Sequence, residues 1–273
     1  MISLLYAGNG AMFDGLLISL MSVSKNTNEK LDVHVFTMNL RDIDGRYTPL
    51  NEKQRAFLET VIRRKNPDSA VRLVDVGSLY RHTLLVSPNS GTDYTPYCFI
   101  RLFADRVGAM PEKILYLDTD TIINGDIKPL FDTDVDGFEY AAVLDHYGRF
   151  FMGYHYINSG VMLLNLKEIR KTGLFTKATE LCAAKKLFLP DQTALHRLTR
   201  RKKLLPGKYN EQKRYDDPET VVQHFTKTII WLPYFHTRTI KPWQTDEVSK
   251  VLTKRYDRLL KEYLREKKKY EEN

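Results

Sequence analysis

Cysteine is scarce in this chain of 273 residues, where Cys98 and Cys182 lie far apart along the sequence. Such a pair forms neither a metal-type motif nor a disulfide framework, so we expect a reducing, cytoplasmic setting. Long apolar runs are also missing, because no stretch approaches the ~20 residues that a membrane-spanning helix needs. The first residues lack a charged leader and reach Gly8-Asn9-Gly10 at once, which argues against a signal peptide.

Two common ligand-binding signatures are absent as well. The glycines after the first apolar run lack the spacing of the dinucleotide fingerprint, and no recognisable nucleic-acid motif occurs. The chain does have a basic excess, with 42 Lys and Arg against 34 Asp and Glu and a formal net charge of +8. This charge suits an anionic partner, whether nucleotide phosphate, lipid headgroup or nucleic acid, without choosing among them.

Strand-like and helix-like segments alternate along the chain. Hydrophobic residues make up 42% of it, which is enough for a substantial core. The apolar patterns predict strands over 2–6, 31–37, 71–74 and 140–144, and helices over 11–23, 51–65 and 96–107. Such alternation favours an α/β fold with a mostly parallel, twisted sheet flanked by helices.

A buried strand followed by two carboxylates organises the sequence. Residues 114–117 form an unbroken apolar run, which predicts a strand buried on both faces. Asp118 and Asp120 follow one residue apart, so in an extended chain their side chains point the same way. Two carboxylates aimed at one spot repel unless a cation lies between them, and manganese and magnesium accept such oxygen ligands. The alternative is an ordinary surface turn, where Asp is common.

Further polar residues stand beside apolar runs, and each has a purely structural alternative. Arg101 lies among apolar residues and either extends to solvent or points at an anion near the acidic pair. Asp191 is a good candidate for the N-cap of a predicted helix. His224 lies in the strand predicted over 221–225, where a histidine is usually just hydrogen-bonded.

The C-terminal residues predict one amphipathic helix over 248–270. Between Lys250 and Tyr270 there are nine basic and three acidic residues. One interpretation is a helix that lies on the inner face of a membrane. The other is a helix that packs on the domain and leaves its basic face in solvent. The apolar stripe comprises Val248, Leu252, Tyr256, Leu259 and Tyr263.

Together these segments resemble the family 8 retaining glycosyltransferases, a group that includes bacterial lipopolysaccharide galactosyl- and glucosyltransferases and glycogenin. The resemblance implies a GT-A fold over 1–243 with 244–273 as a basic helical tail, a UDP-sugar donor, and usually manganese, with magnesium possible. The matching segments are the small-residue turn within 4–9, the arginine at 101, the acidic pair within 115–120, Asn-Ser-Gly within 156–166, Asp-Gln at 191–192 and Lys-Pro-Trp at 241–243.

The resemblance also implies roles for single residues. It places Asp118 and Asp120 on the metal, with His224 as third ligand. In many members a glycine closely follows this histidine, whereas Lys227 stands here, and His236 is the alternative because it lies nearer Lys-Pro-Trp. The other implied contacts are to the nucleotide for Ala7, Gly8, Asn9, Thr119 and Lys241, to the donor sugar for Arg101, Asp145 and Asn158, and to the reaction centre for Asp191 and Gln192.

We therefore expect a metal-dependent retaining transferase that moves glucose or galactose from a UDP-sugar to a saccharide or glycolipid acceptor, as in lipopolysaccharide or cell-surface glycan synthesis. No residue stands out as a carboxylate nucleophile, and the resemblance favours departure and attack on one face of the sugar, with Asp191 and Gln192 stabilising the sugar cation. The alternatives are a metal-dependent nucleotidyltransferase and a non-enzymatic basic module for membrane or nucleic acid. Because the acidic pair repels phosphate without metal, no nucleic-acid partner is expected.

Overall fold

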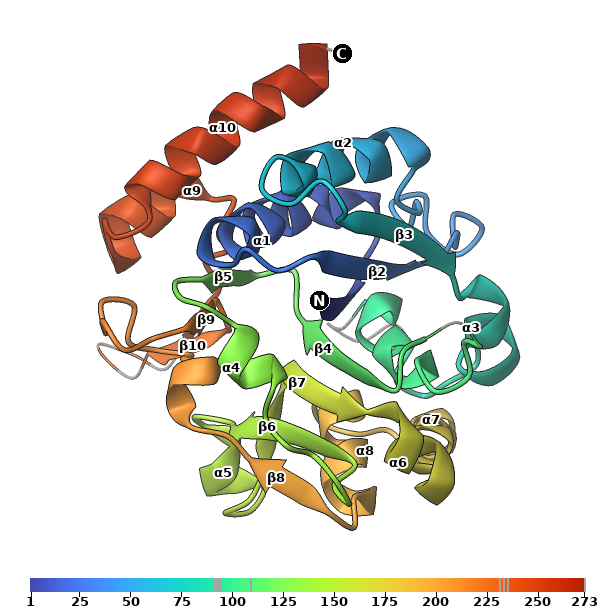
Figure 1. Cartoon of the computed structure of the whole chain (residues 1–273). Helices are drawn as coiled ribbons and strands as arrows, with labels where there is room; N and C mark the ends of the chain where they lie inside the picture. The colour runs from blue at the N-terminus through green and yellow to red at the C-terminus, as the bar shows by residue number, and fades with distance from the viewer. Residues whose placement is uncertain (91–94, 109, 231, 233, 235, 273) are drawn as a thin grey trace.

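A seven-stranded sheet forms the centre of the computed structural model, which describes residues 1–90, 95–108, 110–230, 232, 234 and 236–272. Its strand order is β3-β2-β1-β4-β7-β6-β8 (Figure 1). The strands of this sheet are β1 (Ile2–Ala7), β2 (Leu31–Thr37), β3 (Ala70–Asp75), β4 (Lys113–Leu117), β6 (Tyr140–Leu144), β7 (Ile157–Asn165) and β8 (Lys202–Leu204). Two small antiparallel sheets pair β5 (Thr121–Ile123) with β9 (Val222–His224), and β10 (Thr228–Ile230) with β11 (His236–Arg238).

Helices flank the sheet, as the alternating pattern predicts. The α-helices are α1 (Phe13–Asn26), α2 (Glu52–Arg63), α3 (Gly77–Thr83), α4 (Lys128–Phe131), α5 (Gly148–Phe151), α6 (Leu166–Thr172), α7 (Leu174–Ala184), α8 (Pro190–Leu198), α9 (Thr245–Glu247) and α10 (Asp257–Glu272). Short 3-10 turns are η1 (Gly10–Met12), η2 (Pro96–Cys98), η3 (Ile100–Phe103) and η4 (Gly207–Tyr209), and η5 (Val248–Leu252) is a π-helix.

The direction of β7 brings distant residues together at one edge of the sheet. Strands β1 to β4 run parallel, which confirms the mostly parallel α/β prediction, whereas β7 runs antiparallel to both β4 and β6. Leu117 at the end of β4 pairs with Val161, and the N–H of Asp118 donates to the carbonyl of Gly160 at 2.7 Å. The first residues of β7 therefore lie beside the acidic pair.

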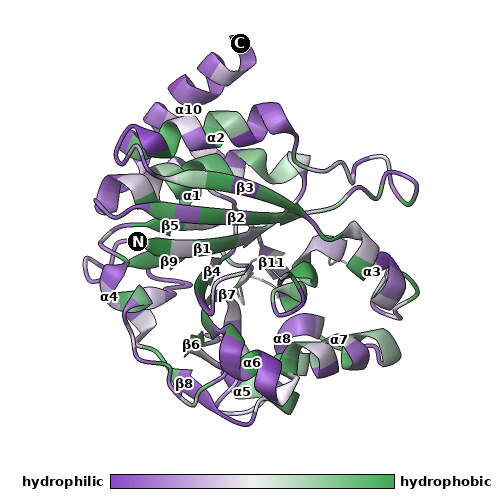
Figure 2. Ribbon diagram, turned by 45° about the vertical axis from the view of Figure 1, so that its right-hand side comes forward, coloured by the Kyte–Doolittle hydropathy of each residue, from purple (hydrophilic) through white to green (hydrophobic). Residues whose placement is uncertain are grey.

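Strand β4 is buried on both faces, as its unbroken apolar run predicts. Leu115 and Leu117 belong to a core shared with α1, α2 and α10. Ile114 and Tyr116 belong to a second core, shared with η3, α6, α7 and α8. Figure 2 shows the central strands as hydrophobic, with hydrophilic residues concentrated on the helices and loops around them. Two apolar layers thus fix the position at which Asp118 and Asp120 leave the sheet.

The continuous helix predicted over 96–107 is wrong, because the chain forms the two short turns η2 and η3 there. Phe99, Leu102 and Phe103 are nevertheless buried, as predicted. An apolar spacing of three residues is also the repeat of a 3-10 turn, so the pattern alone does not separate the two kinds of helix.

The C-terminal helix predicted over 248–270 is confirmed by α10, but its predicted continuity is wrong. The chain leaves helical geometry at Thr253, whose φ of −169° and ψ of 151° are extended, and α10 begins four residues later. The Thr253 hydroxyl donates to Asp216 and accepts a hydrogen bond from the N–H of Arg255 at 2.9 Å. Such local side-chain bonds compete with the helix ladder and account for the break.

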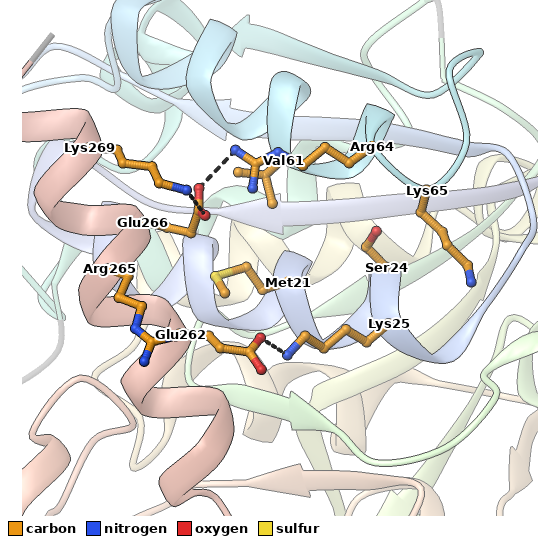
Figure 3. A pocket seen from close by; sticks show the side chains of 10 residues that line it. All are labelled: Met21, Ser24, Lys25, Val61, Arg64, Lys65, Glu262, Arg265, Glu266 and Lys269. Atoms are coloured by element: carbon orange, nitrogen blue, oxygen red, sulfur yellow. Dashed lines mark hydrogen bonds and ion pairs between the residues drawn. The ribbon is translucent and has the colours of Figure 1, made fainter.

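The C-terminal residues, from η5 through α10, pack on the domain through the predicted apolar stripe. Tyr256 and Tyr263 are buried in the core shared with α1, and the ring of Tyr270 lies 4.4 Å from that of Phe13. Ion pairs from Glu266 to Arg64 and from Glu262 to Lys25 span the groove between α10 and helices α1 and α2 (Figure 3). Of the two interpretations of the tail, the packed helix is therefore the one observed, and its stripe is covered by protein. Among the described helices, none combines the length and apolarity that crossing a bilayer requires.

Candidate active site

The acidic pair lies beside a histidine from another part of the chain. Strand β5 begins immediately after Asp120 and pairs with β9, so Thr121 lies opposite His224. The Nε2 atom of His224 lies 3.2 Å from Asp120 Oδ1 and 3.5 Å from Asp118 Oδ2. One ligand atom from each of the three residues falls within 4.8 Å of the others. This is the arrangement in which a single ion could contact all three.

Asp118 is held by two buried partners. Its Oδ1 accepts hydrogen bonds from the Tyr116 hydroxyl at 2.6 Å and from the Arg101 guanidinium at 3.1 Å. The Nε of Arg101 also lies 3.4 Å from Asp191 Oδ2. Arg101 is 5% exposed, so its side chain points at the acidic pair rather than extending to solvent. Burial alone would lower the pKa of Arg101, but Asp118 and Asp191 outweigh it and raise that pKa above its ordinary value.

Asp120 is paired with Lys241. The ammonium group of Lys241 contacts the Asp120 carboxylate and donates to the carbonyl of Phe225 at 3.0 Å. Burial alone would raise the pKa of Asp120, but Lys241 and His224 outweigh it and hold that pKa below its ordinary value. The buried Oδ1 of Asp120 accepts no hydrogen bond. Two carboxylates and an imidazole are donors that manganese accepts, and the unsatisfied oxygen adds to the fit of these residues to a divalent cation.

A second cluster joins four of the residues expected at the donor sugar and reaction centre. Asp145 Oδ2 accepts hydrogen bonds from Asn158 at 3.0 Å and from Gln192 at 3.1 Å. Gln192 in turn accepts the N–H of Ser159 at 3.0 Å, and the Ser159 hydroxyl donates to Asp191 at 3.1 Å. The residues come from the end of β6, the start of β7 and the start of α8. All are buried, so the cluster is rigid and its amide and carboxylate groups are fixed in orientation.

Asp191 does not cap α8. The helix begins at Pro190, its N-cap is Leu189, and the Asp191 side chain points to Arg101 and Ser159. Leu189 has a φ of 47°, a left-handed conformation that strains a residue other than glycine. Strain of this kind persists where the surrounding contacts over-determine the backbone. Here the first turn of α8 is held against β7 by the hydrogen bonds of Asp191 and Gln192 with Ser159.

The residues expected at the nucleotide lie along the same edge of the sheet. Ala7 ends β1, which pairs with β4, and Gly8 and Asn9 follow it. A Cβ on Gly8 would lie 3.0 Å from Met12 Cβ and 3.7 Å from Thr119, so these segments are in close contact. Asn9 is 5% exposed, and its buried Oδ1 has no hydrogen-bond partner. A buried acceptor of this kind is suited to a donor from a ligand.

The family model of glycosyl transferase family 8 matches residues 3–247. The chain belongs to this family. It is 28% identical over 244 residues to a lipopolysaccharide 1,2-glucosyltransferase of Escherichia coli, an alignment that covers 78% of this chain and 67% of the relative. It is 36% identical over 87 residues to the glycosyltransferase GlyA of Streptococcus pneumoniae, covering 32% of this chain and 12% of that protein. The two alignments thus cover two thirds of the length of the glucosyltransferase and about an eighth of the length of GlyA.

The same fold occurs in a solved galactosyltransferase, LgtC, determined in complex with donor and acceptor sugar analogs. The two structures superimpose with a TM-score of 0.72 over 96% of each chain, at 19% sequence identity. This similarity confirms the predicted GT-A fold. The family match and the fold therefore agree with the resemblance that the order of motifs in the sequence indicated.

His236 is not part of the group formed by Asp118, Asp120 and His224. It lies in β11, and its Nδ1 is 2.9 Å from the carbonyl of Tyr234. The sequence also gave no hint of two buried residues that contact the site, Tyr116 and Asn210. Tyr116 reads as an ordinary strand residue, and Asn210 lies in a loop with no motif around it. Their contacts to the site depend on side-chain directions that only the assembled sheet defines.

Proposed function

We propose that this family 8 protein is a metal-dependent retaining transferase that moves a hexosyl group, glucose or galactose, from a UDP-sugar to a saccharide or glycolipid acceptor. The observation that carries the proposal is the meeting of Asp118, Asp120 and His224 next to the cluster around Asp145. In this proposal the three residues hold manganese or magnesium, Lys241 faces the diphosphate, and Ala7, Gly8, Asn9 and Thr119 line the nucleoside. The transferase domain covers 1–243, and 244–273 is its tail.

The charges at the site fit a diphosphate leaving group. When bound, a divalent cation supplies Lewis-acid stabilisation of the charge that develops there. Lys241 adds a compact positive charge and would exchange its contact with Asp120 for one with the diphosphate. Preorganised charge of this kind is usually the largest contribution to catalysis.

The contacts of Asp191 and Gln192 support departure and attack on the same face of the sugar. A double displacement needs a carboxylate that is free to bond the anomeric carbon. Asp191 is engaged by Arg101 and Ser159, and burial raises its pKa above the ordinary value. Gln192 is an amide bonded at both ends, to Asp145 and to Ser159. In the proposed mechanism these groups orient the sugar and stabilise its cationic character without forming a bond to it.

Exposed aromatic rings support a saccharide acceptor. Phe150, Phe151 and Tyr154 are 70%, 70% and 76% exposed. They lie on the connection between β6 and β7, whose ends carry Asp145 and Asn158. Aromatic faces on the rim of a site are well suited to contact the apolar side of a sugar ring.

UDP release tests the proposed reaction. UDP-glucose and UDP-galactose are each incubated with the protein, with and without Mn²⁺, and UDP and hexose 1-phosphate are measured separately. Mn²⁺-dependent release of UDP from one of these donors, lost in Asp120→Asn, is the expected result. Release of hexose 1-phosphate would instead indicate transfer of the uridylyl group, as in a nucleotidyltransferase. UDP release that is unchanged in Asp120→Asn would contradict the role of the acidic pair.

A further inference from the structure

A chain of side-chain hydrogen bonds connects the proposed metal site to the cluster around Asp145, and Asn210 is its central link. Asn210 is 1% exposed and follows η4. Its Nδ2 lies 2.9 Å from Asn158 Oδ1, and its Oδ1 lies 3.1 Å from His224 Nδ1. Asn158 continues the chain by donating to Asp145 at 3.0 Å. The side chain of Asn210 is buried between Asn158 and His224, so its effect on the site passes through these two residues.

The direction of these hydrogen bonds is fixed by a backbone group. The N–H of Gly160 lies 3.0 Å from Asn158 Oδ1, and a backbone N–H can only donate. The oxygen of Asn158 is therefore the acceptor, and its NH₂ group faces the Asp145 carboxylate. Asn210 must then present its own NH₂ group to Asn158 and its oxygen to His224. Rotating the Asn210 amide by 180° would place two oxygens 2.9 Å apart, without a hydrogen between them.

An oxygen at His224 Nδ1 requires a hydrogen on that nitrogen. The other ring nitrogen, Nε2, faces Asp118 and Asp120 at 3.5 and 3.2 Å. Arg101 and Lys241 contact the other oxygens of these carboxylates, so Asp120 Oδ1, which has no hydrogen-bond partner, competes with Asn210 for the ring hydrogen. A neutral imidazole with its hydrogen on Nδ1 has its lone pair on Nε2, which is the form that binds a metal ion.

We propose that Asn210 is a positioning residue, which keeps the hydrogen of His224 on Nδ1 and so leaves Nε2 as a ligand directed at the acidic pair. Asn210 achieves this because Gly160 and Asn158 prevent its amide from rotating. The same side chain couples the histidine to the Asp145 cluster, so the orientations of the two halves of the site are set together. The inference rests on the proposed function through the metal-binding role of His224.

Two substitutions separate positioning from simple packing. Asn210→Leu has nearly the same shape and removes both hydrogen bonds. Asn210→Asp keeps an acceptor for His224 Nδ1 but loses the donor to Asn158. The matched control is Asn165→Leu, which also removes two side-chain hydrogen bonds, to Val135 and Glu168, at the end of β7 away from Gly160.

Nitrogen-15 NMR of the histidine rings in the metal-free protein reads the tautomer directly. Over a pH series, we expect the neutral form of His224 to carry its hydrogen on Nδ1 in the wild type and in Asn210→Asp, and on Nε2 in Asn210→Leu. Mn²⁺ binding, followed by the EPR signal of the free ion, should weaken by about 10–100-fold in Asn210→Leu. It should stay within about threefold of wild type in Asn165→Leu. It should fall less in Asn210→Asp than in Asn210→Leu, since Asn210→Asp keeps an acceptor at His224 Nδ1 although it sets an oxygen against Asn158 Oδ1.

The outcomes distinguish this inference from the proposed function. A wild-type His224 whose neutral form carries its hydrogen on Nε2 overturns the role of Asn210, whatever the transferase activity. So does Asn210→Leu with an unchanged tautomer and unchanged Mn²⁺ affinity. The predicted tautomers in a protein that binds no Mn²⁺ would support the role of Asn210 and refute the proposed metal site.

Discussion

Substituting Gly160 by alanine tests whether His224 belongs to the metal site. A Cβ at this position would lie 2.0 Å from Cε1 of His224 and 2.7 Å from both its Nδ1 and Asp118 Oδ2. Carbon atoms in contact need about 3.5–4.0 Å, so the imidazole must move by more than about 1 Å. Strand β7 cannot move instead, because it is paired with β4 on one side and β6 on the other.

That displacement exceeds what a metal site tolerates, since ligand distances vary by about ±0.2 Å. We expect Gly160→Ala to weaken Mn²⁺ binding at least as much as the loss of a supporting residue, about 10–100-fold. Overpacking of the buried strand should also lower the free energy of unfolding by about 1–3 kcal/mol. Mn²⁺ titration followed by EPR, together with thermal unfolding without metal, measures the two effects separately.

Gly125→Ala is the matched control for this substitution. Gly125 follows β5, and a Cβ there would have its nearest neighbour at 3.8 Å, an ordinary contact. Its Mn²⁺ affinity should equal that of the wild type. If Gly160→Ala also binds Mn²⁺ with wild-type affinity while folding normally, His224 is not a ligand and the reasoning fails.

Three further predictions concern the acidic pair, the histidines and the tail. Asp120→Ala should abolish the Mn²⁺-dependent thermal stabilisation by UDP, because it removes a proposed metal ligand. It should leave the fold intact, because it also relieves the repulsion between two neighbouring carboxylates. Unchanged stabilisation would reject the metal assignment. His224→Ala should steeply raise the Mn²⁺ concentration needed for half-maximal activity, whereas His236→Ala should change turnover or acceptor affinity. A Mn²⁺ titration with the opposite pattern would identify His236 as the metal ligand instead. If the basic face of α10 contacts membranes, binding to anionic vesicles in sedimentation assays should be salt-sensitive. It should also be weaker in the double variant Lys261→Glu, Arg265→Glu. Equal binding of this variant and the wild type would show that this face does not contact the vesicles.

The sequence alone determined the parts of this protein that depend on near neighbours. The apolar run before Asp118 predicted a strand buried on both faces, and two cores do cover β4. The family followed from the order of motifs. Local patterns failed where two structures share one spacing, as in 96–107, or where a side chain interrupts a helix, as at Thr253. Hydrophobic periodicity indicates which face of a segment is buried. It does not distinguish a 3-10 turn from an α-helix, and it does not predict a break caused by a side-chain hydrogen bond.

The tertiary structure decided which distant residues meet. The antiparallel direction of β7 places Asn158 and Gly160 beside the end of β4, and the pairing of β9 with β5 places His224 there rather than His236. Arg101 had two interpretations until the packing of η3 directed it inward. The role inferred for Asn210 depends on a backbone N–H whose position is set by the sheet. These contacts join residues tens to hundreds of positions apart, and their geometry follows from strand order and direction, which no local pattern encodes.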